Sequence, residues 1–167
     1  MFNSDLEKFL FEYKRIEKIK KPKDYLCFDA EYCQFLCLYK KIEIIPDIIL
    51  FDYEKAIIKN KYIEKEYKNI SNYLWIFADS GSGDEWFLHK ENRNVFFYDH
   101  NLGEYSSLDN FVNMKVGFLN FINLAFLIRN YYNDIDNNII EEDEKYFMEN
   151  IYSKNKYFFD IYPYKLF

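Results

Sequence analysis

A chain of 167 residues, half of them hydrophobic, is long enough to form one domain around a sizeable apolar core. Its net charge of −6 is uneven, because residues 77–110 hold seven acids against two bases and residues 130–150 hold seven acids against one. Such regional acidity disfavours nucleic acid, which requires clustered Lys and Arg, and it favours a basic protein partner. The alternative is that these acids only keep the surface soluble.

The chain carries no sequence signal for export or for a membrane. Its N-terminus, "MFNSDLEKFLFEYK", has acids where a signal peptide has a basic region and an apolar stretch. The longest charge-free apolar run, Val116 to Ile128, has thirteen residues, which is short of the roughly 20 that span a bilayer. We therefore expect a cytoplasmic protein in which this run is a buried helix.

The cysteine and histidine residues do not form a metal-binding motif. The three cysteines are an odd number, which fits buried thiols in a reducing cytosol better than a disulfide framework. A zinc site would need a fourth ligand, and His89 and His100 lie far along the chain without paired ligand spacing. No metal and no cofactor is expected. The cysteines are Cys27, Cys33 and Cys37.

Two helices are predicted at the N-terminal end. Residues 4–20 carry apolar side chains at three- and four-residue spacing, which is typical of an amphipathic helix, and Pro22 ends it. Asp29 is a candidate N-cap for a second helix over residues 30–41. The apolar positions of the first helix are Leu6, Phe9, Leu10, Tyr13 and Ile16.

A strand and a helix follow. Residues 42–53, "IEIIPDIILFDY", read as a strand that is broken at Pro46, because proline donates no ladder hydrogen bond. Asp52 stands where a helix cap should be, and residues 53–67 alternate Lys and Glu around a few apolar positions. The pattern predicts a mainly exposed helix.

Three successive strands are predicted in the middle of the chain. Residues 73–80, "YLWIFADS", form a continuous apolar run of strand length, which suits a central strand covered on both faces. Residues 84–90 and 94–100 have the same character, and the polar run 90–94 between them has the length of a hairpin loop. The order predicts an antiparallel meander.

The C-terminal part is predicted to be helical. A long helix from about residue 108 to residue 132 has an apolar surface wider than one stripe, so it should pack on two sides. A final helix begins with "EEDE" at 141–144, where carboxylates favour a helix N-terminus, and Pro163 closes it. Together, the elements predict a single α+β domain over residues 1–167. Its sheet should be mainly antiparallel and twisted, with four to six strands and with helices packed on one face and at both ends.

The loop within "ADSGSGDEW", residues 78–86, combines two glycines with three carboxylates. Gly81 and Gly83 can take φ > 0 and so allow a sharp reversal between strands. A phosphate-binding loop would lead into a helix and bring a Lys, and a calcium loop would need alternating ligands. We expect a tight turn whose carboxylates lie at the solvent-facing end of the sheet. They belong to Asp79, Asp84 and Glu85.

No catalytic motif stands out. Asp84, Glu85 and Asp99 are candidates for a pair of acid–base carboxylates, but solvated hairpin ends explain them as well. His100 after Asp99 is more typical of a turn histidine bonded locally than of a catalytic base. No Ser, Cys or Thr lies in a nucleophile motif. The chain is therefore predicted not to be an enzyme, and a small hydrolase would require carboxylates that converge in a cleft.

Three segments follow one another in an order that can be compared with known families. They are "IFADSGSGDEW" at the end of an apolar strand, "NVFFYDHN" after a short loop, and "SLDNFVNMKVGFLNFI" as an aromatic-rich helix. This order resembles the SUKH superfamily, whose members include the yeast cell-wall assembly regulator domain and many bacterial immunity proteins. The resemblance covers Tyr73 to Ile122, whereas the "LPxDY" and "NGG" elements usual in the family are absent. The matching residues are Ala78, Asp79, Gly81, Gly83, Asp84, Trp86, Val95, Phe97, Asp99, His100, Leu108, Phe111, Phe118 and Phe121.

The resemblance implies an immunity protein that binds a cognate polymorphic or contact-delivered bacterial toxin, a nuclease or a deaminase, and occludes its active site. The alternative is a non-enzymatic regulatory or scaffolding module of the cell-wall assembly regulator kind. An acidic rim would steer a basic toxin, and semi-exposed aromatics would anchor it. Trp86 has a second interpretation as a core residue. The candidate interface residues are Asp79, Asp84, Glu85, Asp99 and Glu104, with Trp86 and Tyr105 as anchors.

Overall fold

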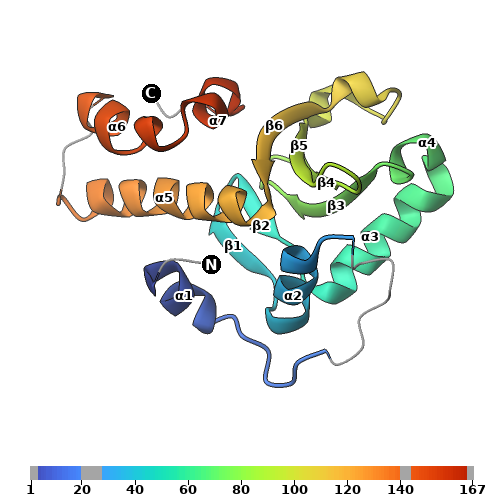
Figure 1. Cartoon of the computed structure of the whole chain (residues 1–167), viewed down its shortest axis with the longest axis horizontal. Helices are drawn as coiled ribbons and strands as arrows, with labels where there is room; N and C mark the ends of the chain where they lie inside the picture. Colours follow the sequence, from blue (N-terminus) through green and yellow to red (C-terminus); the bar gives the residue numbers. More distant parts are fainter. Residues whose placement is uncertain (1–3, 20–27, 140–143, 165–167) are drawn as a thin grey trace.

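The computed structural model describes residues 4–19, 28–139 and 144–164 (Figure 1). The α-helices are α1 (Ser4–Phe11), α2 (Ala30–Leu38), α3 (Tyr53–Glu66), α4 (Lys68–Ser71), α5 (Phe118–Asp136), α6 (Glu144–Asn150) and α7 (Lys156–Ile161). The strands are β1 (Ile42–Ile45), β2 (Ile48–Leu50), β3 (Leu74–Asp79), β4 (Glu85–His89), β5 (Asn94–Tyr98) and β6 (Val112–Gly117). Three short 3₁₀-helices are η2 (His100–Leu102), η3 (Leu108–Asn110) and η4 (Tyr152–Lys154).

The six strands form one sheet in the order β1-β2-β3-β4-β5-β6, and each neighbouring pair is antiparallel. The predicted α+β class and the antiparallel sheet of four to six strands are confirmed. Strand β3 is almost entirely buried, as its continuous apolar sequence predicts. The predicted hairpin between β4 and β5 is also present, with Leu88 opposite Val95.

The core lies between one face of the sheet and helices α2 and α5. Phe121 of α5 contacts both Phe77 of β3 and Trp86 of β4, and Tyr32 of α2 contacts Phe77 edge-on. Helices α6 and α7 lie beside α5 in Figure 1, and Phe158 of α7 packs against Phe121. The core therefore contains many aromatic side chains beside its aliphatic ones, and several of their rings are in edge-on contact.

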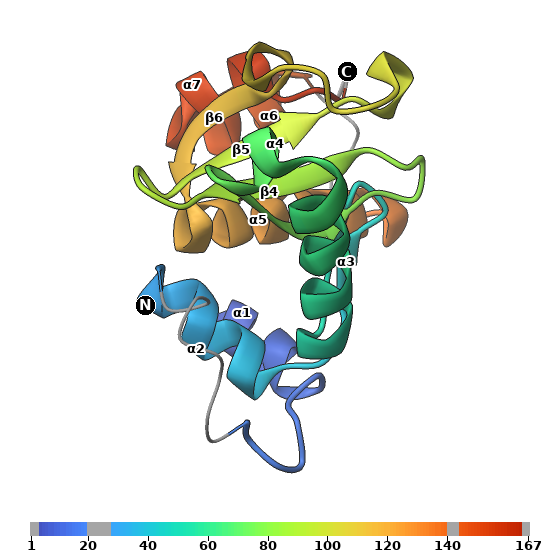
Figure 2. The ribbon, with the colours of Figure 1, turned by 90° about the vertical axis from the view of Figure 1, so that its right-hand side faces the viewer.

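Helix α3 runs along the edge of β3 that β2 leaves uncovered (Figure 2). The buried Asn60 side chain donates to the Ile76 carbonyl at 2.7 Å and accepts from the Ile76 N–H at 2.9 Å. It thus satisfies two backbone groups that a further strand would otherwise satisfy. Helix α3 starts with Asp52 as N-cap, bonded to the Lys55 N–H at 2.8 Å, as predicted.

The first predicted helix is too long. Helix α1 ends at Phe11, and the chain then forms a bridge between Lys14 and Tyr39. Arg15 donates its backbone N–H to Leu38 and its Nε to the Tyr39 carbonyl, so these backbone bonds replace the helical ones. Ile16, which was predicted to face the core, is exposed. Pro22 lies outside the described residues.

The segment 42–53 behaves largely as predicted. The break at Pro46 is a turn, so the predicted broken strand is the hairpin of β1 and β2. Asp29 caps α2 through the Tyr32 N–H at 2.8 Å, although α2 ends at Leu38 and not at residue 41. Cys33 and Cys37 are buried, as predicted, whereas Cys27 lies outside the described residues.

The largest error concerns residues 108–132, which were predicted as one helix. Residues Val112 to Gly117 form β6, and helix α5 begins only at Phe118. The sequence "VNMKV" alternates apolar and polar residues, which is the period of a strand, and Met114 and Val116 point into the core. Lys115 also has a positive φ of 57°, which a helix would not contain.

The C-terminal part is helical but interrupted. Instead of one helix closed by Pro163, the chain forms α6, η4 and α7, and residues 141–143 of the predicted first turn lie outside the described residues. A small second cluster, formed by Tyr131, Phe147 and Ile151, joins α6 to α5. Among the described helices, none has the length and apolar character that crossing a bilayer requires.

Candidate partner-binding site

The seven predicted interface residues gather at one end of the sheet, where β3 ends and β4 begins. Asp79 and Glu85 are opposite each other in the β3–β4 ladder, and Glu85 is opposite Tyr98 in the β4–β5 ladder. The segment that follows β5 lies at the same end of the sheet as the β3–β4 loop (Figure 2). Residues that are up to 26 positions apart, from Asp79 to Tyr105, are thereby brought together.

The β3–β4 loop is the expected tight turn. Ser80 and Asp84 close it through a backbone bond at 2.8 Å, from the Ser80 N–H to the Asp84 carbonyl, and through the Ser80 hydroxyl at 2.9 Å from the Asp84 N–H. Gly83 has φ +100°, where a side chain would be strained, whereas Gly81 does not have a positive φ. Gly81 instead donates its N–H to the Pro46 carbonyl at 2.8 Å, which ties the loop to the β1–β2 turn.

Asp84 is not at the solvent-facing surface, where we expected it, because it is only 6% exposed. One carboxylate oxygen, Oδ1, accepts from the backbone N–H of His100 at 3.1 Å and is 2.7 Å from His100 Nδ1. The other, Oδ2, accepts from the Ser82 hydroxyl at 3.0 Å and the Tyr164 hydroxyl at 2.8 Å. Asp84 therefore joins the loop, the end of β5 and the C-terminal segment.

This network explains why the two segments that suggested the family contain these residues. Asp84 comes from "SGSGDEW" and His100 from "YDHN", and in the fold they are direct partners. The ring of His100 also lies over Gly83, within 3.7 Å of the position that a Cβ would occupy there. Gly83, Asp84 and the distant His100 thus form a structural contact between two hairpins.

Two further acids of the set are paired with lysines of α3. Asp79 accepts from Lys55 Nζ at 2.7 Å, and Glu85 lies 3.5 Å from Lys59 Nζ. Glu85 also accepts a hydrogen bond from the hydroxyl of Tyr105. The two lysines lie four residues apart and therefore on one face of the helix. Their charges reduce the negative potential at this part of the predicted rim.

Asp99 and Glu104 are the members of the set that lie open to solvent. The side chain of Asp99 is 46% exposed, and its Oδ1 accepts from the backbone N–H of Asn101 at 2.8 Å. Glu104 is exposed, and its carbonyl accepts from the Tyr98 hydroxyl at 3.0 Å. Both belong to the segment that leaves the sheet after β5, so this segment carries the accessible negative charge.

The two predicted aromatic anchors differ in exposure. Trp86 is completely buried between Phe97 and Phe121, and its Nε1 donates to the Asp47 carbonyl at 2.8 Å. The interpretation of Trp86 as a core residue therefore fits the structure, and the anchor interpretation does not fit the fold as it stands. Tyr105 is half-buried, in edge-on contact with Tyr98. Burial, then the charge of Glu85, raises the pKa of Tyr105, so its hydroxyl is a hydrogen-bond donor.

Sequence reasoning missed Asp47 and Tyr164, which come from distant segments. Burial raises the pKa of Asp47, and the charge of Asp84 raises it further. Tyr164 supplies one of the four hydrogen bonds to the Asp84 carboxylate, from a position 80 residues along the chain. No local pattern could have placed either residue here. Lys55 and Lys59 were visible as an i,i+4 pair, but their carboxylate partners were not.

Asp84, Asp99 and His100 each present a possible metal-ligand atom, and these atoms lie within 4.8 Å of one another. A cation held by all three would compete with the hydrogen bond that already joins His100 Nδ1 to Asp84. The same pair could orient His100 as a general base, but within the described residues the His100 ring bonds to Asp84 and to no nucleophilic hydroxyl or thiol. Chemically, the Asp84–His100 pair is a salt bridge that connects the β3–β4 loop to the end of β5.

The Asp84–His100 pair predicts a pH dependence of stability. The hydrogen bond to Asp84 raises the pKa of His100, so this contribution is complete below about pH 6.5, the unfolded value, and is lost as the pH rises through the folded value. Burial opposes ionisation of Asp84, but the bonds from His100, Tyr164 and Ser82 lower its pKa overall. That contribution is lost on acidification, below about pH 4.

In the natural protein, we expect the urea midpoint of unfolding to decrease as the pH rises beyond about 6.5. In His100→Gln, the midpoint should change less over the same pH range. His89→Gln is the control, because burial lowers the pKa of His89, and its effect on stability lies below about pH 6.5. An equal fall in His100→Gln and the natural protein would show that the pair does not contribute.

Comparison of the chain with family models, with curated proteins and with solved structures gives no significant match. Function must therefore be inferred from the residues and their geometry.

Proposed function

We propose that this protein is an immunity protein that binds a cognate bacterial toxin with a basic surface, a nuclease or a deaminase, and neutralises it by occluding its active site. In this proposal, the protein binds the toxin in the cytoplasm and catalyses no reaction. The observation that carries it is a fixed, exposed, acidic segment at one end of the sheet. The resemblance of residues 73–122 to the SUKH superfamily supplies the class of partner.

The docking segment comprises residues 99–109, between β5 and β6. Glu104 and Asp109 are its exposed acids, the side chain of Asp99 is 46% exposed, and the segment contains no Lys or Arg. Asp99 caps η2 at its start, and the Tyr98 hydroxyl binds the carbonyls of Gly103 and Glu104. The segment is thus held to the sheet by defined bonds, which lowers the conformational entropy lost on binding.

The docking segment also carries apolar side chains that a partner can cover. Leu102 is 53% exposed and Leu108 is 37% exposed, and both stand among the acids. An apolar centre with a charged surround is the usual anatomy of a protein interface. Leu102 thus takes the anchoring role that the sequence had suggested for Trp86, while Asp99 and Glu104 supply the steering charge.

This combination suits a toxin whose active site binds phosphate-rich substrates. Such a site is lined by Lys and Arg, and an acidic protein surface competes for the same charges. Opposite potentials speed the encounter and fix its orientation, whereas the apolar contact mainly slows dissociation. Occlusion then needs no chemistry from the immunity protein, which is consistent with the structural role of Asp84 and His100.

The test is co-expression with the toxin encoded by the adjacent gene. We expect the natural protein to restore growth and to copurify with the toxin. The double reversal Asp99→Lys with Glu104→Lys should lower the association rate by about tenfold at low salt and weaken its salt dependence, because the steering charge is gone. Leu102→Asp should instead raise the dissociation rate.

Reversal of Glu91 and Glu149 to Lys is the matched control, because it makes the same change in net charge with exposed residues outside the docking segment. If both reversals slow association equally, only net charge matters and the docking segment is wrong. If the natural protein neither restores growth nor binds the toxin, the immunity function itself is wrong.

A further inference from the structure

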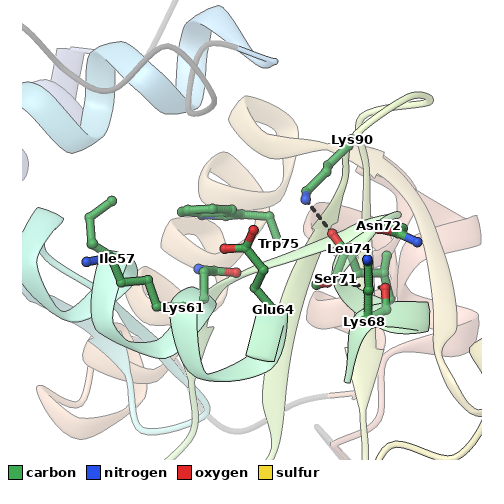
Figure 3. Close-up of a pocket in the computed structure, with 10 residues that line it drawn as sticks. Ile57, Lys61, Glu64, Lys68, Ser71, Asn72, Leu74, Trp75 and Lys90 are labelled. Carbon is green, nitrogen blue, oxygen red and sulfur yellow. Dashed lines mark hydrogen bonds between the residues drawn. The ribbon is translucent and has the colours of Figure 1, made fainter. Parts of the chain in front are cut away.

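A pocket of about 390 Å³ lies at the opposite end of β3 from the docking segment. Helices α3 and α4, the start of β3 and the residue after β4 form its walls (Figure 3). Its lining combines apolar side chains, Ile57, Leu74 and Trp75, with the charged side chains of Glu64, Lys68 and Lys90. Three lysines, including Lys61, line the pocket together with one acid, although the chain as a whole is acidic.

Lys90 is fixed at one side of the pocket. Its ammonium group donates to the Ser71 carbonyl and lies 6.0 Å from the centre of the Trp75 ring. Figure 3 shows Lys68 on the same side of the pocket, near Ser71 and Asn72. An ammonium group has three N–H donors, and Ser71 takes one from Lys90. This side of the pocket can therefore hold a carboxylate.

Glu64 supplies the opposite charge. Glu64 lines the same pocket as Trp75 and Lys68, and Figure 3 draws its carboxylate on the Trp75 side of Lys68. Burial lowers the pKa of Lys90, and the charge of Glu64 partly opposes this shift. Within the described residues, however, Glu64 and Lys90 do not form an ion pair at 4.0 Å or less. Glu64 and Lys90 thus line the same pocket without forming an ion pair with each other.

We propose that this pocket binds a free α-amino acid with an apolar side chain. The ligand carboxylate would bind Lys90 and Lys68, its ammonium group would bind Glu64, and its side chain would lie against Trp75 and Ile57. The volume falls in the usual range for small-molecule sites. Only a zwitterion carries both charges on one carbon, so neither end of a polypeptide satisfies both sides of the pocket. The inference is independent of the immunity function.

The experiment is a titration of the intact protein with phenylalanine, followed by NMR of the two tryptophan indole N–H signals. Phenylalanine should shift the Trp75 signal in a saturable way. It should leave the Trp86 signal unchanged, because Trp86 is buried near the other end of the β3–β4 ladder. Trp75→Phe assigns the signals. N-acetylphenylalanine, which lacks the ammonium group, and phenylalaninamide, which lacks the carboxylate, should each bind at least about tenfold more weakly.

Glu64→Gln and Lys68→Gln should each raise the Kd for phenylalanine by about tenfold. Glu66→Gln and Lys65→Gln are matched controls, because these neighbours on α3 do not line the pocket and pair with each other. Equal binding of N-acetylphenylalanine and phenylalanine would overturn the proposal in favour of a simple anion site. No saturable shift, or equal effects of control and pocket variants, would overturn it entirely.

Discussion

Trp86→Ala is expected to lower the free energy of unfolding by about 3–5 kcal/mol, the range for removal of a large buried aromatic side chain. Trp86 is fully buried, and its ring contacts Phe97 of β5, Phe121 of α5 and Tyr162, which follows α7. Its indole N–H also anchors the β1–β2 turn through the Asp47 carbonyl. The substitution therefore removes packing and leaves the part-buried carbonyl of Asp47 without this donor.

Trp86→Phe is the matched variant, because it keeps an aromatic ring and loses the indole hydrogen bond. It should cost clearly less than Trp86→Ala, and urea unfolding followed by circular dichroism measures both. The comparison also separates the two interpretations of Trp86. A loss of less than about 1 kcal/mol in Trp86→Ala, together with loss of toxin binding, would contradict the core assignment and restore Trp86 as an interface anchor.

The parts of the fold that could be predicted are those governed by local patterns. The caps at Asp29 and Asp52, the break at Pro46 and the apolar run of β3 all depend on neighbouring residues, and all are present. The error at β6 has a different origin, since "VNMKV" fits both a strand and the start of a wide apolar helix. Only its pairing with β5, with Phe97 opposite Val112, decides between them.

The site could be predicted in place but not in detail. The order of the segments was enough to bring Asp79, Glu85 and Asp99 to one end of the sheet. The exposure of each acid of the predicted interface depends on partners from other elements, such as Lys55 for Asp79, and His100 with Tyr164 for Asp84. Such long-range pairs leave no trace in local spacing. The acidic rim is therefore narrower than the sequence indicated and centres on the docking segment.

Asn60→Ala is expected to lower the free energy of unfolding by about 2–4 kcal/mol, because it leaves both the N–H and the carbonyl of Ile76 without partners in a buried place. Asn60 supplies the hydrogen bonds from α3 to the backbone at the edge of β3. Asn60→Asp keeps the shape and the acceptor but loses the donor to the Ile76 carbonyl, so it should also destabilise. Urea unfolding gives the loss, and hydrogen exchange at the Ile76 amide locates it.

Asn123→Ala is the matched control, because the two asparagines share one local interaction. Asn60 donates to the Ala56 carbonyl and Asn123 to the Leu119 carbonyl, each four residues back on its helix. Asn123 is half-buried, and Ala favours helix, so its replacement should change stability by no more than about 0.5 kcal/mol. Equal losses in both variants would show that the helical bond matters and that the bonds to Ile76 do not. A large loss in Asn60→Ala alone, with faster exchange at Ile76, would show that the bonds from Asn60 to Ile76 stabilise the contact between α3 and the sheet.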